Sequence, residues 1–282
     1  NHPAPAGGEG LECAKLSREA VDAHWAGMLG RMIEKFGPLA GQSFTKVEID
    51  SWEVGTQNWT PRFREEFLRR RGYDLLTFLP VFAGQIVENT TVTERFLWDL
   101  RRTIADLFAE NYAARLRELA HQHGLKLAVE NYGTGPFDDL QYGGMADIPM
   151  GVHWMHNGSP QGCTLLAASA AHTYGHRIVG AEAFTAGELG GNRWDSDPYA
   201  FKRLGDLIFC SGVNKMIFHA GVLQRFCNKA CPPPTCWCSP QKTPRRPPTA
   251  AAPSPPCPPA TISTSARPTP SSTASASATG GS

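Results

Sequence analysis

Short strand-like segments alternate with amphipathic helix-like segments along the chain, and this alternation limits the possible folds more than any other feature. The predicted strands lie at 44–50, 125–130, 146–153, 177–184 and 213–219. Between them, apolar residues recur every three or four positions, as in helices with one buried face, and the longest such stretch runs from about 92 to 123. Short connections favour a parallel sheet covered by helices, so we predict an α/β protein.

The number of strands leaves two versions of this fold open. A closed (β/α)8 barrel has eight strands, whereas five are predicted up to residue 219. Either three strands of a TIM-type barrel are missing, or the sheet is open. Because the chain starts at Asn1 without an initiating Met or a signal peptide, we favour a partial (β/α)8 barrel. For the same reason, the missing signal peptide gives no indication of the compartment.

The C-terminal part of the chain differs in composition from the rest. Residues 220–282 hold 14 of the 23 prolines and six Lys or Arg, but no Asp or Glu. Such a segment buries too little apolar surface to offset its conformational entropy, so we predict a disordered tail after a domain spanning 1–219. Out-of-frame translation after a truncated domain would explain this composition, and an evolved Pro/Ser/Thr linker is the alternative.

The composition, with 41% hydrophobic and 19% charged residues, is typical of a soluble globular protein. The net charge is +1, which indicates neither a nucleic acid nor a membrane surface as partner. No apolar run approaches the roughly 18 residues that a membrane-spanning helix needs. The cysteines before the tail are Cys13, Cys163 and Cys210. Their scatter gives no disulfide framework, and we expect Cys163 and Cys210 to be small core residues.

Three of the predicted strands end in acidic residues. Asp50 closes the first strand and Glu53 follows it in the loop, while Glu130 and Glu182 lie at the ends of the second and fourth. The C-terminal ends of parallel strands meet at one face of a barrel, so these carboxylates are expected to converge. Cleavage of a glycosidic bond needs two carboxyl groups, one protonated and one ionised. We therefore predict a glycosidase-like site at this face.

Aromatic and imidazole side chains surround these acids in the sequence. They are Trp52, Trp59, Tyr132, His153, Trp154, Phe184 and, at the end of the fifth strand, His219. Flat rings cover the apolar faces of sugars while nearby polar groups bind hydroxyls, so this composition favours a sugar-binding site. Trp25 and Trp98 are instead predicted to be core residues, because they are assigned to the apolar stripes of helices.

Six short segments together resemble glycoside hydrolase family 106. They are DSWE at 50–53, RGYD at 71–74, ERFLWD at 94–99, ENYG at 130–133, ADIPMG at 146–151 and AEAFT at 181–185. The characterised members of that family are α-L-rhamnosidases, and the resemblance extends over about residues 7–219. It implies a (β/α)8 barrel, an inverting single-displacement mechanism and calcium at the sugar site.

The resemblance also implies roles for the matching residues. Glu53 is expected to be the general acid and Glu182 the general base that activates water, while Asp50 tunes Glu53 or orients the sugar. Glu130 is expected to contact a sugar hydroxyl or calcium, and Trp52, Tyr132, His153, Trp154 and His219 complete the expected substrate-binding set. The implied substrates are rhamnose-containing glycosides, oligosaccharides or polysaccharides, in the periplasm or outside the cell.

Two alternatives stay open because the expected barrel does not continue after His219. One is a noncatalytic sugar-binding remnant of a broken barrel. The other is a retaining barrel glycosidase, such as a β-galactosidase. Carboxyl groups roughly 6.5–9.5 Å apart characterise inverting enzymes and about 5–5.5 Å retaining ones, so the distance between the two catalytic acids separates these mechanisms.

Overall fold

The computed structural model describes residues 10–53, 55–154, 161–185 and 198–218, and everything below concerns these residues. All of them belong to the first of two compact units, which spans residues 1–241. The predicted tail, His219 and the boundary predicted at residue 219 lie outside the described residues.

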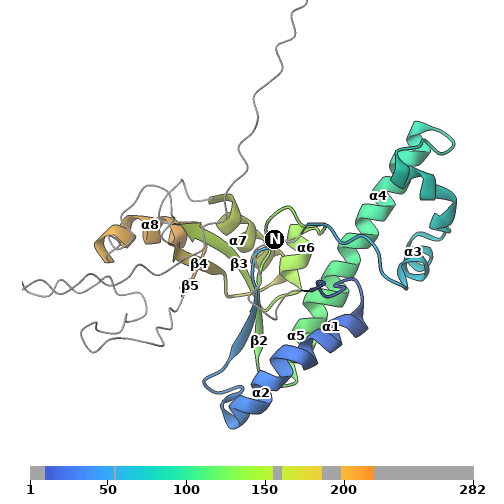
Figure 1. Ribbon diagram of the computed structural model, residues 1–282. Helices are drawn as coiled ribbons and strands as arrows, with labels where there is room; N and C mark the ends of the chain where they lie inside the picture. The colour runs from blue at the N-terminus through green and yellow to red at the C-terminus, as the bar shows by residue number, and fades with distance from the viewer. Residues whose placement is uncertain (1–9, 54, 155–160, 186–197, 219–282) are drawn as a thin grey trace, which may run out of the picture. The chain divides into compact units, whose positions relative to one another are not determined.

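Five parallel strands form a single sheet in the order β1-β2-β3-β4-β5 (Figure 1). Their bounds are Lys46–Ile49 for β1, Lys126–Glu130 for β2, Ile148–Trp154 for β3, Gly180–Thr185 for β4 and Lys215–Phe218 for β5. Each strand pairs with the next along the chain, and every pair is parallel. This order lacks the reversal of a doubly wound sheet and is that of consecutive strands in a (β/α)8 barrel. The predicted partial barrel is therefore confirmed.

The sheet curves into a half-barrel. Lys46 on β1 and Lys215 on β5 belong to opposite edges of the sheet, yet their side chains interact. Burial lowers the pKa of Lys46, and the neighbouring Lys215 ammonium lowers it further. The strand registers place Lys46 and Lys215 on the same face as Ala128, Ile148 and Met150, which form an apolar cluster of their own. This is the concave face, which corresponds to the interior of a closed barrel.

Helices cover the opposite face of the sheet, as the alternation of segments predicts. The described helices, in chain order, are α1 Arg18–Trp25, η1 Ala26–Gly30, α2 Arg31–Phe36, η2 Gly37–Leu39, α3 Phe63–Arg71, η3 Leu75–Ala83, α4 Thr90–Leu107, η4 Phe108–Ala114, α5 Arg115–His121, α6 Asp139–Gly144, α7 Gln161–Tyr174 and α8 Pro198–Cys210. Of these, α3 and η3 pack on α4. The long predicted helix is confirmed as the continuous run of α4, η4 and α5, in which η4 is a π-helical stretch. None of the described helices is both long and apolar enough to cross a membrane.

Two large clusters of apolar side chains join the helices to the sheet. Val47, Leu127 and Val129 of β1 and β2 belong to the cluster that includes Leu107 and Phe108 at the junction of α4 and η4. Residues of α7, β4 and α8 form the second cluster. The helix α7 approaches β3 so closely that a Cβ at Gly151 would lie 2.6 Å from the Cys163 carbonyl oxygen. Glycine is therefore required at Gly151 for this contact.

Three details differ from the sequence predictions. Trp25 is buried as expected, but Trp98 is 69% exposed and is not a core residue. It follows the buried Phe96 by two positions, about 200° around a helix, and so faces outward. The Gly-rich segment after Glu130, which has no clear helical period of apolar residues, contains α6. The first turn of α6 is capped by the Asp138 carboxylate, which accepts a hydrogen bond from the Gln141 amide. Cys163 is only half-buried and Cys210 is exposed, so neither is the core residue that was expected.

Candidate active site

Three of the predicted acidic residues meet at the C-terminal end of the sheet. Asp50 and Glu130 lie level with each other, because Ile49 and Val129 are paired in the residues just before them. Glu182 lies on β4, where it is paired with Val152. Carboxylate oxygens of Asp50, Glu130 and Glu182 all lie within 4.8 Å of one another. The strand ends thus bring together side chains separated by 132 positions of sequence, from residue 50 to residue 182.

Glu130 is the most buried member of this acidic group, at 1% exposure. The Tyr132 hydroxyl donates a hydrogen bond to its Oε2 at 2.8 Å, while its Oε1 is buried without a hydrogen-bond partner among the described residues. Burial raises the pKa of Glu130 to about 9; the bond from Tyr132 opposes this rise, and the Asp50 and Glu182 carboxylates add to it. Without a bound cation, Glu130 is therefore protonated at neutral pH.

Glu53 is not a member of this group of three among the described residues. It is exposed on the loop after β1, where the Ser51 hydroxyl donates to its Oε1 at 3.2 Å. The adjacent Trp52 fixes this loop, because its indole N–H donates to the Gly55 carbonyl at 2.7 Å. Glu53 is thus an accessible carboxylate on an anchored loop, three positions after Asp50 of the acidic group.

Trp52 itself lies in the core rather than on the surface of the site. It is buried, and its ring meets Phe108 and Phe137 edge-on, with centroids 4.9 and 6.0 Å away. Its backbone bridges to Gly133 in the loop after β2. The position of Trp52 ties the loops after β1 and β2 together. Its expected contact with substrate stays a prediction.

The other predicted aromatic residues are placed differently from one another. Tyr132 is directed at Glu130, and Trp154 is exposed at the end of β3. His153 is buried with its ring perpendicular to Phe184, and burial lowers the pKa of its imidazole. Trp59 is exposed and packs on Phe63, at a pocket of about 290 Å³ that Leu79 and Phe82 also line. That pocket includes none of the acidic group.

A bulge in β4 follows Glu182. His153 pairs with Ala183 and Trp154 with Thr185, so Phe184 is the extra residue. Its φ of 61° is unusual for a residue with a side chain. Bulges of this kind redirect side chains and occur often beside active sites.

Two residues near the acidic group were not predicted as site residues. Cys163, at the start of α7, is half-buried, and its thiol has a pKa raised by burial and by the nearby Glu130 carboxylate. Asn131 is buried, and its Nδ2 donates to the Asp139 carbonyl at 3.0 Å. Asn131 could have been predicted as a site residue from its position directly after Glu130, within the segment 130–133. Cys163 had no signal, because its place depends on how α7 packs against β3.

The acidic group suits a hard cation. Calcium and similar ions take oxygen ligands, and three carboxylates from three strands offer six oxygens. The buried Glu130 Oε1, which has no hydrogen-bond partner among the described residues, fits such a ligand. Asp50, Glu130 and Glu182 are the residues that would hold the ion.

Comparison with known proteins decides the family. The model of the family described as alpha-L-rhamnosidase, glycoside hydrolase family 106, matches residues 1–235. The chain belongs to glycoside hydrolase family 106. All four predicted acids lie within the matched residues.

Two relatives show how much of a family 106 protein this chain represents. A protein of Formosa agariphila named "Putative beta-glucuronidase" is 47% identical over 224 residues, which are 79% of this chain and 19% of that protein. The structure of a rhamnosidase from Novosphingobium sp. PP1Y matches with a TM-score of 0.70 and 37% identity, over 78% of this chain and 22% of that one. The chain thus spans about a fifth of the length of these two relatives.

Proposed function

We propose that this chain carries the catalytic acids of an inverting α-L-rhamnosidase. The observation that carries the proposal is the acidic group Asp50, Glu130 and Glu182 at the C-terminal end of a half-barrel, with Glu53 three positions after Asp50 on an anchored loop. In TIM-type barrels, catalytic residues come from the C-terminal ends of several strands. The membership in family 106 supports terminal α-L-rhamnosyl groups as the substrate.

The two catalytic carboxylates have different surroundings, as their roles require. Glu53 is exposed, so its carboxyl group can reach the oxygen of a departing sugar or alcohol and donate a proton. Glu182, within the acidic group, accepts a proton from the water that attacks the anomeric carbon. An inverting mechanism needs Glu53 and Glu182 to be far enough apart to leave room for water. Asp50, a member of the acidic group, tunes Glu53 or orients the sugar.

Calcium is the cation that we propose for the acidic group. Asp50 and Glu130 would hold it with one oxygen of Glu182, whose second oxygen stays available for water. When bound, the ion supplies positive charge that attracts adjacent sugar hydroxyls. Tyr132 then keeps Glu130 in place through its hydrogen bond.

The test is hydrolysis of an aryl α-L-rhamnoside by the 282-residue chain. Glu53→Gln and Glu182→Gln should each lower kcat by about 10²–10⁴ with KM changed little, because each removes a proton transfer while preserving shape. Glu34→Gln on α2, an exposed carboxylate far from the strand ends in sequence, is the matched control. Proton NMR of the first product should show inversion at the anomeric carbon.

Each alternative predicts a different result. Initial retention of configuration would establish the retaining glycosidase instead. Rhamnose binding without any hydrolysis would establish the noncatalytic remnant. A Glu182→Gln variant with wild-type kcat would remove Glu182 from the mechanism.

A β-glucuronidase activity is the second candidate, because the Formosa agariphila relative carries that name. Release of the aryl group from a β-D-glucuronide but not from an α-L-rhamnoside would favour it.

A further inference from the structure

A second pocket lies between α4 and the loops that follow β1 and β2. Its volume is about 450 Å³, within the range of small-molecule sites. Its lining includes Thr56, Trp98, Arg101, Arg102, Pro136 and Phe137. We call it the α4 pocket.

The α4 pocket shares both of its loops with the predicted catalytic residues. Thr56 follows Glu53 by three positions, and Phe137 follows Tyr132 by five. The bridge between Trp52 and Gly133, with the edge contact between Trp52 and Phe137, holds these two loops together. A ligand in the α4 pocket therefore contacts the segments that carry Glu53 and Tyr132, as a neighbouring unit of the same substrate would.

One wall of the α4 pocket combines an open aromatic ring with a free positive charge. Trp98 is 69% exposed, and Arg101 lies three positions later, on the same side of α4. Arg101 is exposed and has no ion-pair partner among the described residues. Indole rings receive sugar faces, and guanidinium groups pair with carboxylates through two parallel hydrogen bonds.

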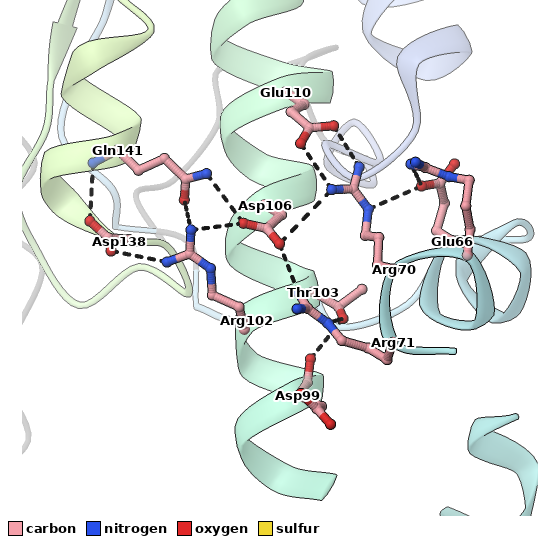
Figure 2. Close-up of polar contacts among 11 residues, drawn as sticks. Glu66, Arg70, Arg71, Asp99, Arg102, Thr103, Asp106, Glu110, Asp138 and Gln141 are labelled. Carbon is pink, nitrogen blue, oxygen red and sulfur yellow. Dashed lines mark hydrogen bonds and ion pairs between the residues drawn. The ribbon is translucent and has the colours of Figure 1, made fainter. Parts of the chain in front are cut away.

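Arg102, the other arginine in the wall, is already neutralised. It pairs with Asp106 at 3.0 Å and with Asp138 at 3.2 Å, and it donates to the Gln141 side chain at 3.1 Å. Figure 2 shows these contacts running from α4 to α6. Asp138 also lines the pocket, and Arg102 balances its negative charge. Among the charged lining residues, Arg101 therefore carries the positive charge that is left unbalanced.

The same polar network makes the wall rigid before any ligand arrives. Asp106 also pairs with Arg71 of α3 at 2.7 Å and accepts from the Gln141 Nε2 at 3.2 Å (Figure 2). α3, α4 and α6 are therefore linked through one carboxylate. A site whose walls are already ordered loses less entropy on binding.

We propose that the α4 pocket is a subsite for a sugar with one negative charge, a uronic acid, placed next to the rhamnosyl unit. The sugar ring lies on Trp98 and its carboxylate pairs with Arg101. Its place beside a rhamnosyl unit rests on the proposed rhamnosidase function, whereas the binding itself does not. The substrate class is thus a rhamnosyl-uronic acid saccharide.

Binding is tested first, with the 282-residue chain and methyl β-D-glucuronoside, against methyl β-D-glucoside, which has the same ring without the charge. Saturation-transfer NMR should show the glucuronoside bound at least about tenfold more tightly, as a hydrogen bond to a charged group predicts. Arg101→Ala should abolish this difference, and Trp98→Ala should weaken both sugars. Arg95 is an exposed arginine of α4 outside the pocket lining, so Arg95→Ala is the matched control. This variant should leave the difference in affinity between the two sugars unchanged.

Equal affinity for the two sugars, or a preference that survives Arg101→Ala, overturns the proposal. Stronger binding of methyl glucoside 6-sulfate, lost in Arg101→Ala, keeps the anionic subsite and identifies sulfate as its ligand. Kinetics form the second arm: kcat/KM for an α-L-rhamnosyl-glucuronate should fall about tenfold in Arg101→Ala. If the chain cleaves no rhamnoside but Arg101 still governs glucuronoside binding, the rhamnosidase function fails and the subsite stands.

Discussion

At the scale of single residues, Glu130 shows how burial sets the chemistry of a carboxyl group. Burial raises its pKa from 4.5 to about 9, against the hydrogen bond from Tyr132 and with the help of Asp50 and Glu182. When a chelator has removed calcium, the Glu130 carboxyl therefore stays protonated in the folded protein at pH values where the unfolded chain, above about pH 4.5, has released this proton. The free energy of unfolding should be fully maintained near pH 4 and fall as the pH rises toward 9.

Glu130→Gln tests this because its side chain cannot ionise. With a chelator present, its Tm should match the wild type near pH 4 and exceed it at pH 8 by at least about 2–4 °C, the effect of roughly 1 kcal/mol in a domain of this size. Calcium, which binds ionised carboxylates, should raise the wild-type Tm at pH 8 and leave Glu130→Gln nearly unchanged. A constant difference between the two proteins from pH 4 to 9, or a Tm indifferent to calcium, would contradict these assignments.

The two tryptophans of the site region mark the limit of prediction for single residues. The exposure of Trp98 could have been found from the helical period, because it follows the core residue Phe96 by two positions. The burial of Trp52 could not have been predicted, because Trp52 comes after β1, where the strand period no longer applies. Its burial depends on a bridge to Gly133, about 80 residues away in the chain. The acids were predictable because parallel strand ends must meet.

At the scale of elements, the strands and the long helices could be predicted from the spacing of their apolar residues, whereas the short elements could not. α6 holds two glycines in six residues, and its one clear signal was the capping Asp138. Its position depends on tertiary contacts, since Asn131 fills the space beside Gly143, where a Cβ would lie 2.6 Å away. The π-helical stretch in the long helix likewise leaves no mark in the apolar pattern.

Asp106 is predicted to hold α3, α4 and α6 together. Its side chain is 14% exposed and pairs with Arg71 and Arg102. Asp106→Asn leaves these two guanidinium groups without their shared carboxylate, so we expect a loss of about 2–3 kcal/mol in the free energy of unfolding. Urea unfolding followed by circular dichroism measures it.

Asp206→Asn on α8 is the matched control for Asp106→Asn. Its partner Lys202 is 71% exposed, and exposed pairs of this kind contribute roughly 0–1 kcal/mol. Equal losses in the two variants would show that the Asp106 network does not link the helices.

At the scale of the whole molecule, the defining property is the curvature of a sheet with five of the eight strands of a barrel. Among the described residues, β1 and β5 each pair on one side only. Their side chains nevertheless approach across the concave face, where Lys46 meets Lys215. The order of the strands was predictable from the sequence, but this approach was not, because curvature depends on the twist of all five strands together.

The approach of the two lysines can be measured in solution. Lys46→Met and Lys215→Met should each stabilise the fold, because each removes the repulsion between two ammonium groups. The double variant should gain less than the sum of the two, by about 0.5–1 kcal/mol, since the repulsion can be removed only once. This shortfall should shrink at high salt. Lys35→Met on α2, an exposed lysine, should combine additively with Lys215→Met. Additivity between Lys46 and Lys215 would mean that the sheet in solution is flatter than this half-barrel.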